Sequence, residues 1–309
     1  MASPDVVTVG DIMVDARVPA EAAGGAHVVG KVRLHAGGSA ANAAVWAAAT
    51  GAAAGVVGRV GDDFAGRALR RELEARGVDA HLAVDSYLPT GCVLQLGERT
   101  IAERGANARL EPGDLPSPLE AGAVLVSGYI LLHDDSATAA LEALERARSE
   151  WIAVDAASAR LLERYGPKRF LDATRPATVL LLNADEALAL TDSEPVTAAQ
   201  ALAGLYRLVC VKRGRDGAVA CFHGTLQHAD APPTALVDDS GSGDAFAGAL
   251  LAALAGGASV GAALEAACRA GAAAAGSDGL WPSSSESGPR GDDISRPTIS
   301  IRKHRSRRR

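Results

Sequence analysis

The chain has 309 residues, of which 48% are apolar, 22% are charged and 4% are aromatic. This balance excludes global disorder, a collagen-like repeat and a coiled coil, and the length allows either two domains or one large α/β domain with additions. Alanine and glycine dominate the apolar residues. Such a composition suits helices packed closely on a sheet better than an all-β sandwich.

The net charge of −6 is unevenly distributed along the chain. Residues 302–309 (RKHRSRRR) contain five arginines, one lysine and no acid, so the remaining residues together carry −12. An acidic body argues against a nucleic-acid partner, because neutralising phosphates requires a basic face. The basic end itself could bind nucleic acid or an anionic surface, but a solvated run of charge is the simpler interpretation.

Cysteine spacing and the N-terminal residues bear on the location of the protein. Cys92, Cys210, Cys221 and Cys268 show no CxxC spacing, and the histidines show no HxH or HExxH spacing, so we expect reduced thiols and no zinc site. The first residues, MASPDVVTVGDIMVD, have acids within the apolar stretch and no basic segment before it, unlike a signal peptide. Apolar runs are shorter than the roughly 18 residues of a membrane span. We therefore expect a cytoplasmic protein without membrane association.

Short apolar runs alternate with longer amphipathic stretches along most of the chain. The runs predict strands at 5–10, 55–58, 123–127, 151–155, 178–183, 208–212 and 218–222. The stretches predict helices at 39–50, 63–76, 136–149, 184–191, 197–204, 243–255 and 259–275. Continuous apolar strands that alternate with helices indicate a parallel sheet covered on both faces.

Three segments depart from this alternation. Residues 12–35 and 90–104 show polar alternation with glycine turns, which predicts exposed antiparallel strands that pair into a small sheet over the main one, as a lid. Residues 283–309 are rich in serine, glycine, proline and charge, which predicts disorder. We therefore expect one folded domain over 1–282, followed by a disordered tail.

The most informative motif is VDDSGSGDAFAGALLAALAGG, residues 237–257, in which a glycine-rich turn leads directly into an apolar helix. The backbone amides of Gly241, Ser242 and Gly243 can point together at one place, and with the helix dipole they form an anion site. Asp244 at the mouth of this site could accept a proton from a hydroxyl that attacks a phosphoryl group. The alternative is that Asp244 is only a helix N-terminal residue stabilised by the dipole.

A second glycine-rich segment, AGGSAANAAVWAAATG at 36–51, is followed by VGRVGDDFAGRALRREL at 57–73. Its small residues allow close approach of a polar ligand, and Asn42 offers a donor and an acceptor to a hydroxyl. Alone, the segment would equally fit a tightly packed alanine helix after a turn. Together, the two glycine-rich segments resemble both signatures of the PfkB (ribokinase-like) carbohydrate kinase family, in order and separation.

The resemblance covers roughly residues 5–275 and includes GDIMVD at 10–15, RGANARL at 104–110, NADE at 183–186 and KRGRDGA at 212–218. It implies a ribokinase-like three-layer α/β/α fold with a mostly parallel central sheet and a small β-lid. It also implies a phosphotransferase that moves the γ-phosphoryl group of ATP to a hydroxyl of a sugar or nucleoside, with ATP and Mg²⁺ as cofactors.

The same resemblance assigns roles to individual residues. Asp244 becomes the catalytic base, and the amides of Gly241, Ser242 and Gly243 become the anion hole. The family's positions that bind substrate hydroxyls correspond to Asp15, Gly38 and Asn42. Asn183 and Glu186 correspond to the family's motif for Mg²⁺ and phosphate, and the metal is expected to be held through water. The alternative is that NADE is a simple helix start capped by Asn183. The nucleotide loop is matched by Lys212, Gly214 and Gly217. A monovalent-cation (K⁺) loop is matched by Asp238 and Ser240.

The sequence also departs from the family pattern. Asp239, Ser240 and Ser242 stand where Thr-Thr and Ala are usual, and SDGLWPSSS at 277–285 replaces the usual Thr-Arg-x-Gly-Ala turn, which puts cation dependence in doubt. Met13 and Tyr129 stand where ribokinases carry polar sugar-binding residues. Arg104 is expected beneath the lid, where it either binds an acidic substrate or is a solvated lid residue.

We therefore expect a kinase for a sugar or sugar acid. The alternatives are a nucleoside kinase of the same family and a non-catalytic relative that binds a sugar or nucleotide. A Rossmann dehydrogenase is excluded, because GDIMVD rather than GxGxxG follows the first strand. By resemblance alone, a homodimer is the expected assembly.

Overall fold

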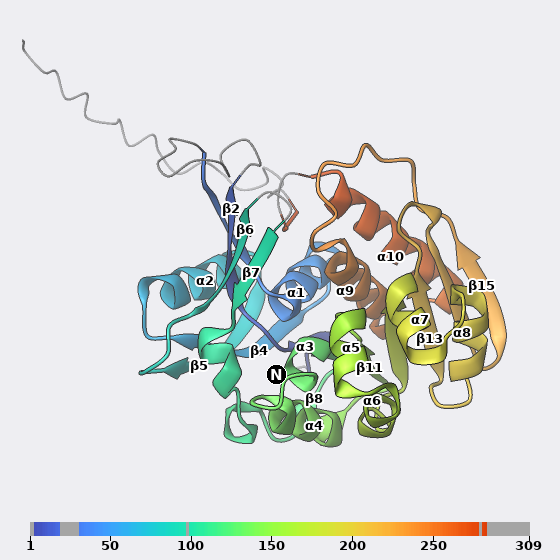
Figure 1. Ribbon diagram of the computed structural model, residues 1–309, viewed down its shortest axis with the longest axis horizontal. Coiled ribbons are helices and arrows are strands. Elements are labelled where there is room, and N and C mark those ends of the chain that lie inside the picture. Colours follow the sequence, from blue (N-terminus) through green and yellow to red (C-terminus); the bar gives the residue numbers. More distant parts are fainter. Residues whose placement is uncertain (1–2, 19–30, 97–98, 278–279, 283–309) are drawn as a thin grey trace, which may run out of the picture.

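The computed structural model describes residues 3–18, 31–96, 99–277 and 280–282. In this part of the chain, nine strands form one sheet in the order β15-β14-β13-β12-β11-β9-β1-β4-β5 (Figure 1). The seven strands from β13 to β5 in that order are parallel, whereas β14 and β15 run antiparallel to their neighbours. The strands are β1 (Val6–Val9), β4 (Ala54–Gly61), β5 (Val78–Asp85), β9 (Ala123–Ser127), β11 (Trp151–Asp155), β12 (Val179–Asn183), β13 (Leu208–Lys212), β14 (Ala218–Phe222) and β15 (Thr225–Ala229).

All seven strands predicted from continuous apolar runs are present in this sheet, because central strands are buried on both faces. The sequence did not predict β5 and β15, which are the two edge strands. In β5 buried and exposed residues largely alternate, and β15 (TLQHA) has only one buried residue. Their polar residues face solvent, so the continuous apolar signal is missing.

Helices cover both faces of the sheet, which confirms the three-layer α/β/α arrangement (Figure 1). Alternate residues of β1 divide between the layers: Val7 and Val9 pack with α3 to α8, and Val6 packs with α1, α9 and α10. One layer consists of α3 (Gly128–Leu131), α4 (Ala137–Arg146), α5 (Ala159–Tyr165), α6 (Pro167–Ala173), α7 (Ala184–Thr191) and α8 (Pro195–Leu202). The other consists of α1 (Ser39–Ala49), α2 (Phe64–Ala75), α9 (Ser242–Ala255) and α10 (Val260–Ala275).

Each of the seven predicted helices is present, but α4 is shorter than predicted. It ends at Arg146 because Ala147 and Arg148 form the short strand β10 (Ala147–Arg148), which pairs with β8 (Leu119–Glu120). The unpredicted α3, α5 and α6 have four to seven residues, too few to show a helical period. The described ranges also contain three 3₁₀ turns, η2 (Gly105–Arg109), η3 (Pro112–Asp114) and η4 (Gly214–Asp216).

Small residues bring α1 and α9 into close contact. Gly248 of α9 lies against the α1 backbone, so that a Cβ placed there would be 2.2 Å from the Ala43 carbonyl oxygen. The residues of α1 from Ala40 to Ala47 are all buried. The abundance of alanine and glycine therefore allows the first turns of two helices, some 200 residues apart in sequence, to lie side by side.

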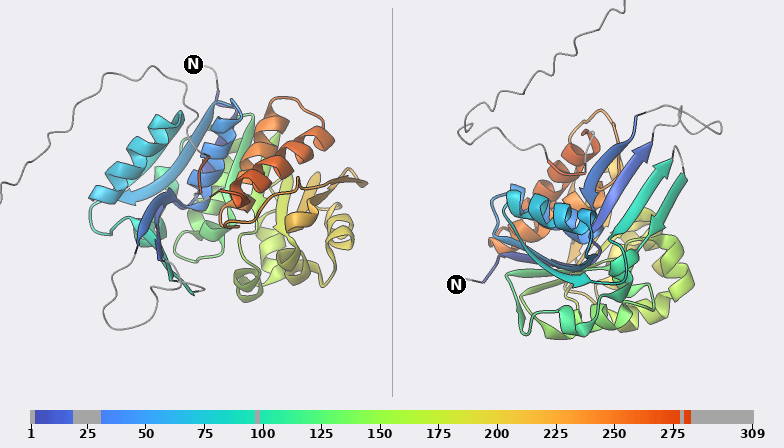
Figure 2. Two further views of the ribbon diagram at one scale, coloured as in Figure 1. Left: turned by 90° about the horizontal axis from the view of Figure 1, so that it is seen from above. Right: turned by 90° about the vertical axis from the view of Figure 1, so that its left-hand side faces the viewer.

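A second, four-stranded sheet has the order β3-β2-β6-β7 and projects from the main body (Figures 1 and 2). It is formed by β2 (Met13–Val18), β3 (Arg33–Gly37), β6 (Gly91–Leu96) and β7 (Arg99–Glu103), within the two segments predicted for a lid. The prediction of antiparallel pairing was wrong for the central pair, since β2 and β6 are parallel. Between β3 and β6 the chain leaves the sheet to form α1, β4, α2 and β5. The paired strands β2 and β6 are therefore far apart in the chain and are not joined as a hairpin.

Some expectations concern residues beyond those described. Residues 19–30 of the predicted lid and the predicted disordered tail, 283–309, lie outside the described ranges. Within those ranges, no helix is both long and apolar enough to cross a membrane. All four cysteines are described, and all four are free thiols.

Candidate active site

Several polar residues lie where the parallel strands end. Asp155 is the last residue of β11, Asn183 is the last of β12, and Lys212 is the last of β13. In an open parallel sheet the carboxyl ends of the strands form the usual binding edge. The N-terminus of α9, with the sequence GSGD, lies at the same edge, because Lys212 Nζ is 3.3 Å from the position of a Cβ on Gly243.

Asp244 is held at both carboxylate oxygens by the first turns of α1. Ser39 Oγ donates to Asp244 Oδ1 at 2.8 Å, and Asn42 Nδ2 donates to Asp244 Oδ2 at 2.7 Å. Burial raises the pKa of Asp244 to about 6, and the nearby Asp155 adds to the shift, while the bonds from Asn42 and Ser39 oppose it. A carboxylate with a pKa near neutrality is suited to general-base catalysis.

Gly38 explains how α1 reaches this position. It is the N-cap residue of α1 with φ +95°, and a Cβ there would be 2.3 Å from the Asp11 carbonyl oxygen. Only glycine allows this backbone conformation and close approach without strain. The structure therefore brings together the predicted Gly38, Asn42 and Asp244.

The anion-hole loop is formed as a turn at the start of α9. Gly241 is the N-cap residue in the left-handed conformation, with φ +76°. The Ser242 amide, one of the three predicted donors, donates to the Asp239 carbonyl oxygen at 3.1 Å. Gly241 and Gly243 flank it, and the dipole of the 14-residue helix α9 begins here.

Lys212 places a positive charge beside this loop. Its ammonium group donates to Asp155 Oδ2 at 2.7 Å, and both side chains are largely buried. Burial alone would lower the pKa of Lys212, but Asp155 and Glu186 outweigh it and raise the pKa. Lys212 is therefore a permanent cation at neutral pH.

Asn183 and Glu186 form a reciprocal helix cap at the start of α7. The Glu186 amide donates to Asn183 Oδ1 at 2.9 Å, and the Asn183 amide donates to Glu186 Oε2 at 2.8 Å. Burial raises the pKa of Glu186 to about 7; Lys212 opposes the shift and Asp155 adds to it. The cap and a role toward a cation are compatible, because a divalent ion would relieve the repulsion between Glu186 and Asp155.

A divalent ion at Glu186 would need ligands from outside the protein. The described ranges contain no cluster of three or more His, Cys, Asp or Glu residues able to hold a metal ion. Mg²⁺ characteristically keeps several waters and binds through one or two carboxylates plus phosphate oxygens. The carboxylate of Glu186 fits that mode of binding, whereas Asp155 is already paired with Lys212.

Asp238 and Ser240, which correspond to the monovalent-cation loop, form contacts with the second sheet. Arg17 of β2 forms an ion pair with Asp238, and Gln95 Nε2 of β6 donates to Ser240 Oγ at 3.2 Å. Asp238 Oδ1 also accepts from the Ser240 amide at 2.8 Å. With its carboxylate paired to a guanidinium, this donor set does not fit a K⁺ ion, and it instead joins the second sheet to the loop before α9.

Asp15 and Arg104 lie where the second sheet meets the body. Burial raises the pKa of Asp15 on β2 to about 6, against the opposing effect of Arg17. Arg104 donates to Asp11 Oδ1 at 3.2 Å and to Asp135 Oδ1 at 2.5 Å. Its side chain is largely buried, so Arg104 is not a solvated residue, and two carboxylates already neutralise its charge.

The remaining predicted residues are near the edges of the site. Gly214 and Gly217 form the turn between β13 and β14, directly after Lys212. Met13 is buried at the start of β2. Tyr129 lies in α3 near Asp244, and burial together with the charges of Asp244 and Asp155 raises its pKa.

Sequence reasoning missed three residues that contribute to the site. Asp155 ends a predicted strand, so its position was a usable signal, and Ser39 begins a predicted helix. The contact between Trp281 and Asn42 joins residues 239 positions apart and has no local signal.

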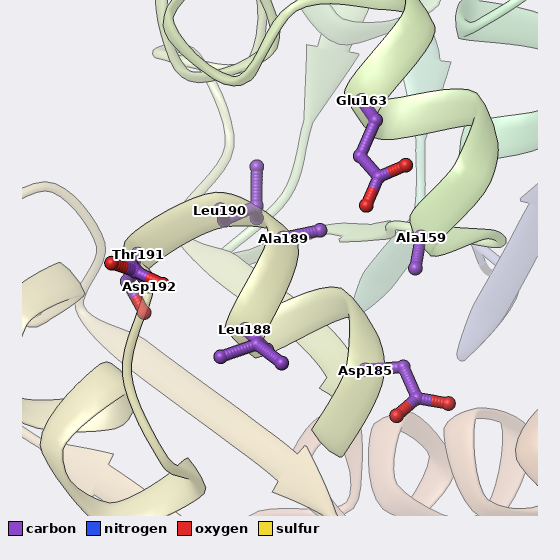
Figure 3. A pocket seen from close by; sticks show the side chains of 8 residues that line it. All are labelled: Ala159, Glu163, Asp185, Leu188, Ala189, Leu190, Thr191 and Asp192. Carbon is purple, nitrogen blue, oxygen red and sulfur yellow. The ribbon is translucent and has the colours of Figure 1, made fainter.

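A pocket of about 700 Å³ lies elsewhere, between α5 and α7 (Figure 3). Its lining combines acidic side chains such as Glu163 and Asp185 with apolar ones such as Leu188 and Leu190. It contains none of the predicted site residues, and no lysine or arginine lines it. The pocket is therefore separate from the polar residues at the edge of the sheet.

The fold and this site define a phosphotransferase of the ribokinase-like class, and comparison with known proteins identifies the family. Residues 3–286 match the family described as pfkB family carbohydrate kinase. A fructokinase of Klebsiella pneumoniae is 33% identical over 243 residues, which cover 71% of this chain and 76% of that protein. The chain belongs to the PfkB family and is a carbohydrate kinase.

Solved structures share the fold of this chain. A probable sugar kinase from Rhizobium etli superimposes with a TM-score of 0.82 at 23% identity, over 92% of this chain and 96% of that one. Aminoimidazole riboside kinase from Salmonella enterica, solved with aminoimidazole riboside and an ATP analogue, has a TM-score of 0.76 at 26% identity, over 89% and 95%. The predicted ribokinase-like fold is thereby confirmed.

Proposed function

We propose that this kinase transfers the γ-phosphoryl group of ATP to a hydroxyl of a neutral sugar, with Asp244 as the general base. The observation that carries the proposal is the carboxylate of Asp244, fixed by Ser39 and Asn42 at the N-terminus of α9, with its pKa raised to about 6. The name of the fructokinase relative supports a sugar as the acceptor.

The residues divide the work of the transfer. Asp244 accepts the proton of the attacking hydroxyl, whose oxygen forms a bond to the γ-phosphorus as the bond from that phosphorus to the ADP oxygen breaks. The amides of Gly241 and Gly243 and the dipole of α9 stabilise the charge on the transferred group. Lys212 contributes a fixed positive charge beside them. Bound through Glu186 and water, Mg²⁺ would neutralise charge on the phosphates.

The charges around the acceptor site favour a neutral sugar over a sugar acid. Asp15 and Asp244 are matched to the acceptor and its base, Asp11 is paired with Arg104 beside them, and burial raises the pKa of each. The one arginine predicted to bind an acidic substrate, Arg104, is paired with Asp11 and Asp135. A substrate carboxylate would thus meet like charges without a free cation.

A nucleoside is the second candidate acceptor, and the likeness to aminoimidazole riboside kinase favours it. Tyr129 is 37% exposed near Asp244 and would offer a ring face to a base. A sugar without a base would use only the hydroxyl-binding side of the same site.

A substrate panel tests the proposal. The purified chain would be incubated with ATP and Mg²⁺ and with neutral hexoses and pentoses, the matching sugar acids, or nucleosides, while ADP release and the phosphorylated product are measured. We expect neutral sugars to give the highest kcat/KM and the matching acids to be at least tenfold poorer. Preference for a sugar acid would refute the charge argument, and ADP release without a phosphorylated sugar or nucleoside would refute the proposed transfer.

A further inference from the structure

The segment Leu280–Pro282 returns to the start of α1 after α10 has ended, in the part of the sequence that departs from the family pattern. Trp46 Nε1 donates to the Leu280 carbonyl oxygen at 3.0 Å, and the Leu280 side chain is within 3.0 Å of the Cβ positions of Gly37 and Gly241. Arg76 of α2 stacks on the Trp281 ring at 5.1 Å. The segment is therefore anchored on α1 and α2.

Trp281 contacts the residue that holds the base. Its indole Nε1 donates to Asn42 Oδ1 at 2.8 Å, while Asn42 Nδ2 donates to Asp244 Oδ2 at 2.7 Å. An indole N–H is only a donor, so the atom of Asn42 that faces Trp281 must be the amide oxygen. The NH₂ group is then turned toward Asp244. Both Trp281 and Asn42 are buried, so water does not readily replace either bond.

We propose that Trp281 is a positioning residue for catalysis, which fixes the amide of Asn42 so that it donates to the catalytic carboxylate of Asp244. The inference rests on the proposed role of Asp244 as the base. It adds a third residue to the pair that orients this carboxylate, and it gives the divergent segment after α10 a function in the active site.

The mechanism of this effect is both steric and electrostatic. Without the indole donor, Asn42 Oδ1 is left buried and unpaired, and the amide is no longer held from that side, so its hydrogen bond to Asp244 weakens. Since that bond opposes the raised pKa, its weakening raises the pKa of Asp244 further. The charged and polar groups that face Asp244 are otherwise unchanged; they are Ser39 on α1, Tyr129 on α3, Asp155 on β11 and Lys212 on β13.

Trp281→Phe removes the donor and keeps an aromatic ring over Arg76. The matched control is Trp46→Phe, which removes the neighbouring indole donor to the Leu280 carbonyl oxygen and leaves the donors and acceptors of the Trp281–Asn42 and Asn42–Asp244 hydrogen bonds in place. We expect Trp281→Phe to lower kcat about fivefold at pH 7, the effect of one buried hydrogen bond, with the KM for ATP unchanged. The acidic limb of its pH–rate profile should move to higher pH. Trp46→Phe should keep the wild-type kcat and acidic limb.

A double-mutant cycle separates positioning from general destabilisation. In an Asn42→Ala background, Trp281→Phe should have no further effect on kcat, because the residue through which it acts is gone. A wild-type kcat and acidic limb in Trp281→Phe, equal losses in both tryptophan variants, or additive losses with Asn42→Ala would each overturn the inference. Failure of the proposed function is distinguishable, because Asp244→Asn would then remain active, whereas failure of the inference leaves Asp244→Asn inactive.

Discussion

Gly248→Ala tests whether the close packing of α1 and α9 creates the active site. The added Cβ would lie 2.2 Å from the Ala43 carbonyl oxygen and 3.0 Å from the Ala47 nitrogen, both of them backbone atoms. The helices must therefore separate by about 1 Å to restore a van der Waals contact. We expect overpacking to cost about 2–3 kcal/mol and the gain in helix propensity to offset about 1 kcal/mol of it.

The same separation should affect catalysis more than stability. Ser39 and Asn42 lie on α1 and Asp244 on α9, so their hydrogen bonds of 2.8 and 2.7 Å would lengthen. A misplacement of about 1 Å can cost on the order of 100-fold in rate. Net destabilisation of about 1–2 kcal/mol would lower the melting temperature by only a few degrees.

Urea unfolding and kcat, measured on the same preparation, check this prediction. Gly261→Ala in α10 is the matched control, since its added Cβ meets only the flexible end of Gln227 at 3.2 Å. It should be neutral or slightly stabilising and keep full activity. If Gly248→Ala is as stable and as active as wild type, close packing of α1 and α9 does not position the base.

Three further predictions follow from the charges. Because Asp244 must be ionised to act, kcat/KM should fall tenfold per pH unit below about pH 6, measured as a pH–rate profile; a kcat/KM independent of pH between 5 and 7 would contradict this. Its raised pKa also means that ionising Asp244 opposes folding as pH rises from about 4 to 6. Activity should be equal in K⁺ and in Na⁺, and Arg17→Gln, which frees Asp238, should become stimulated by K⁺; K⁺ dependence of the wild type would contradict the pairing. Arg104→Gln leaves buried Asp11 unpaired and should lower the free energy of unfolding by about 3 kcal/mol in urea titration, whereas an unchanged value would show that the pair contributes nothing.

The parts of the structure with a local sequence signal were predictable. Central strands such as β9 (AVLVS) are buried on both faces, so that continuous apolar runs mark them, and the GSGD turn marks the start of α9. The edge strand β5 was not predicted, because half of its surface is solvated. Local signals therefore predicted the central strands, the longer helices and the main motif.

Contacts between distant residues were beyond sequence reasoning. Asn42 was predicted to bind substrate hydroxyls, but its amide bonds to Trp281 and Asp244, which depend on how α1, α9 and the segment after α10 pack. Arg17 and Asp238 were likewise separated by 221 residues and joined only by the fold. Such contacts depend on how the elements pack. The composition indicates that close packing is possible, but it does not show which residues meet.

The role of Asp244 as the base is tested most directly by Asp244→Asn. The side chain keeps its size but cannot accept the proton, so phosphorylation of the sugar found in the substrate panel should fall by at least a thousandfold. ATP affinity, measured by calorimetry in the presence of Mg²⁺, should stay within about twofold of the wild type because the amides of the anion hole remain. Phosphoryl transfer by Asp244→Asn at the wild-type rate would contradict the assignment of the base.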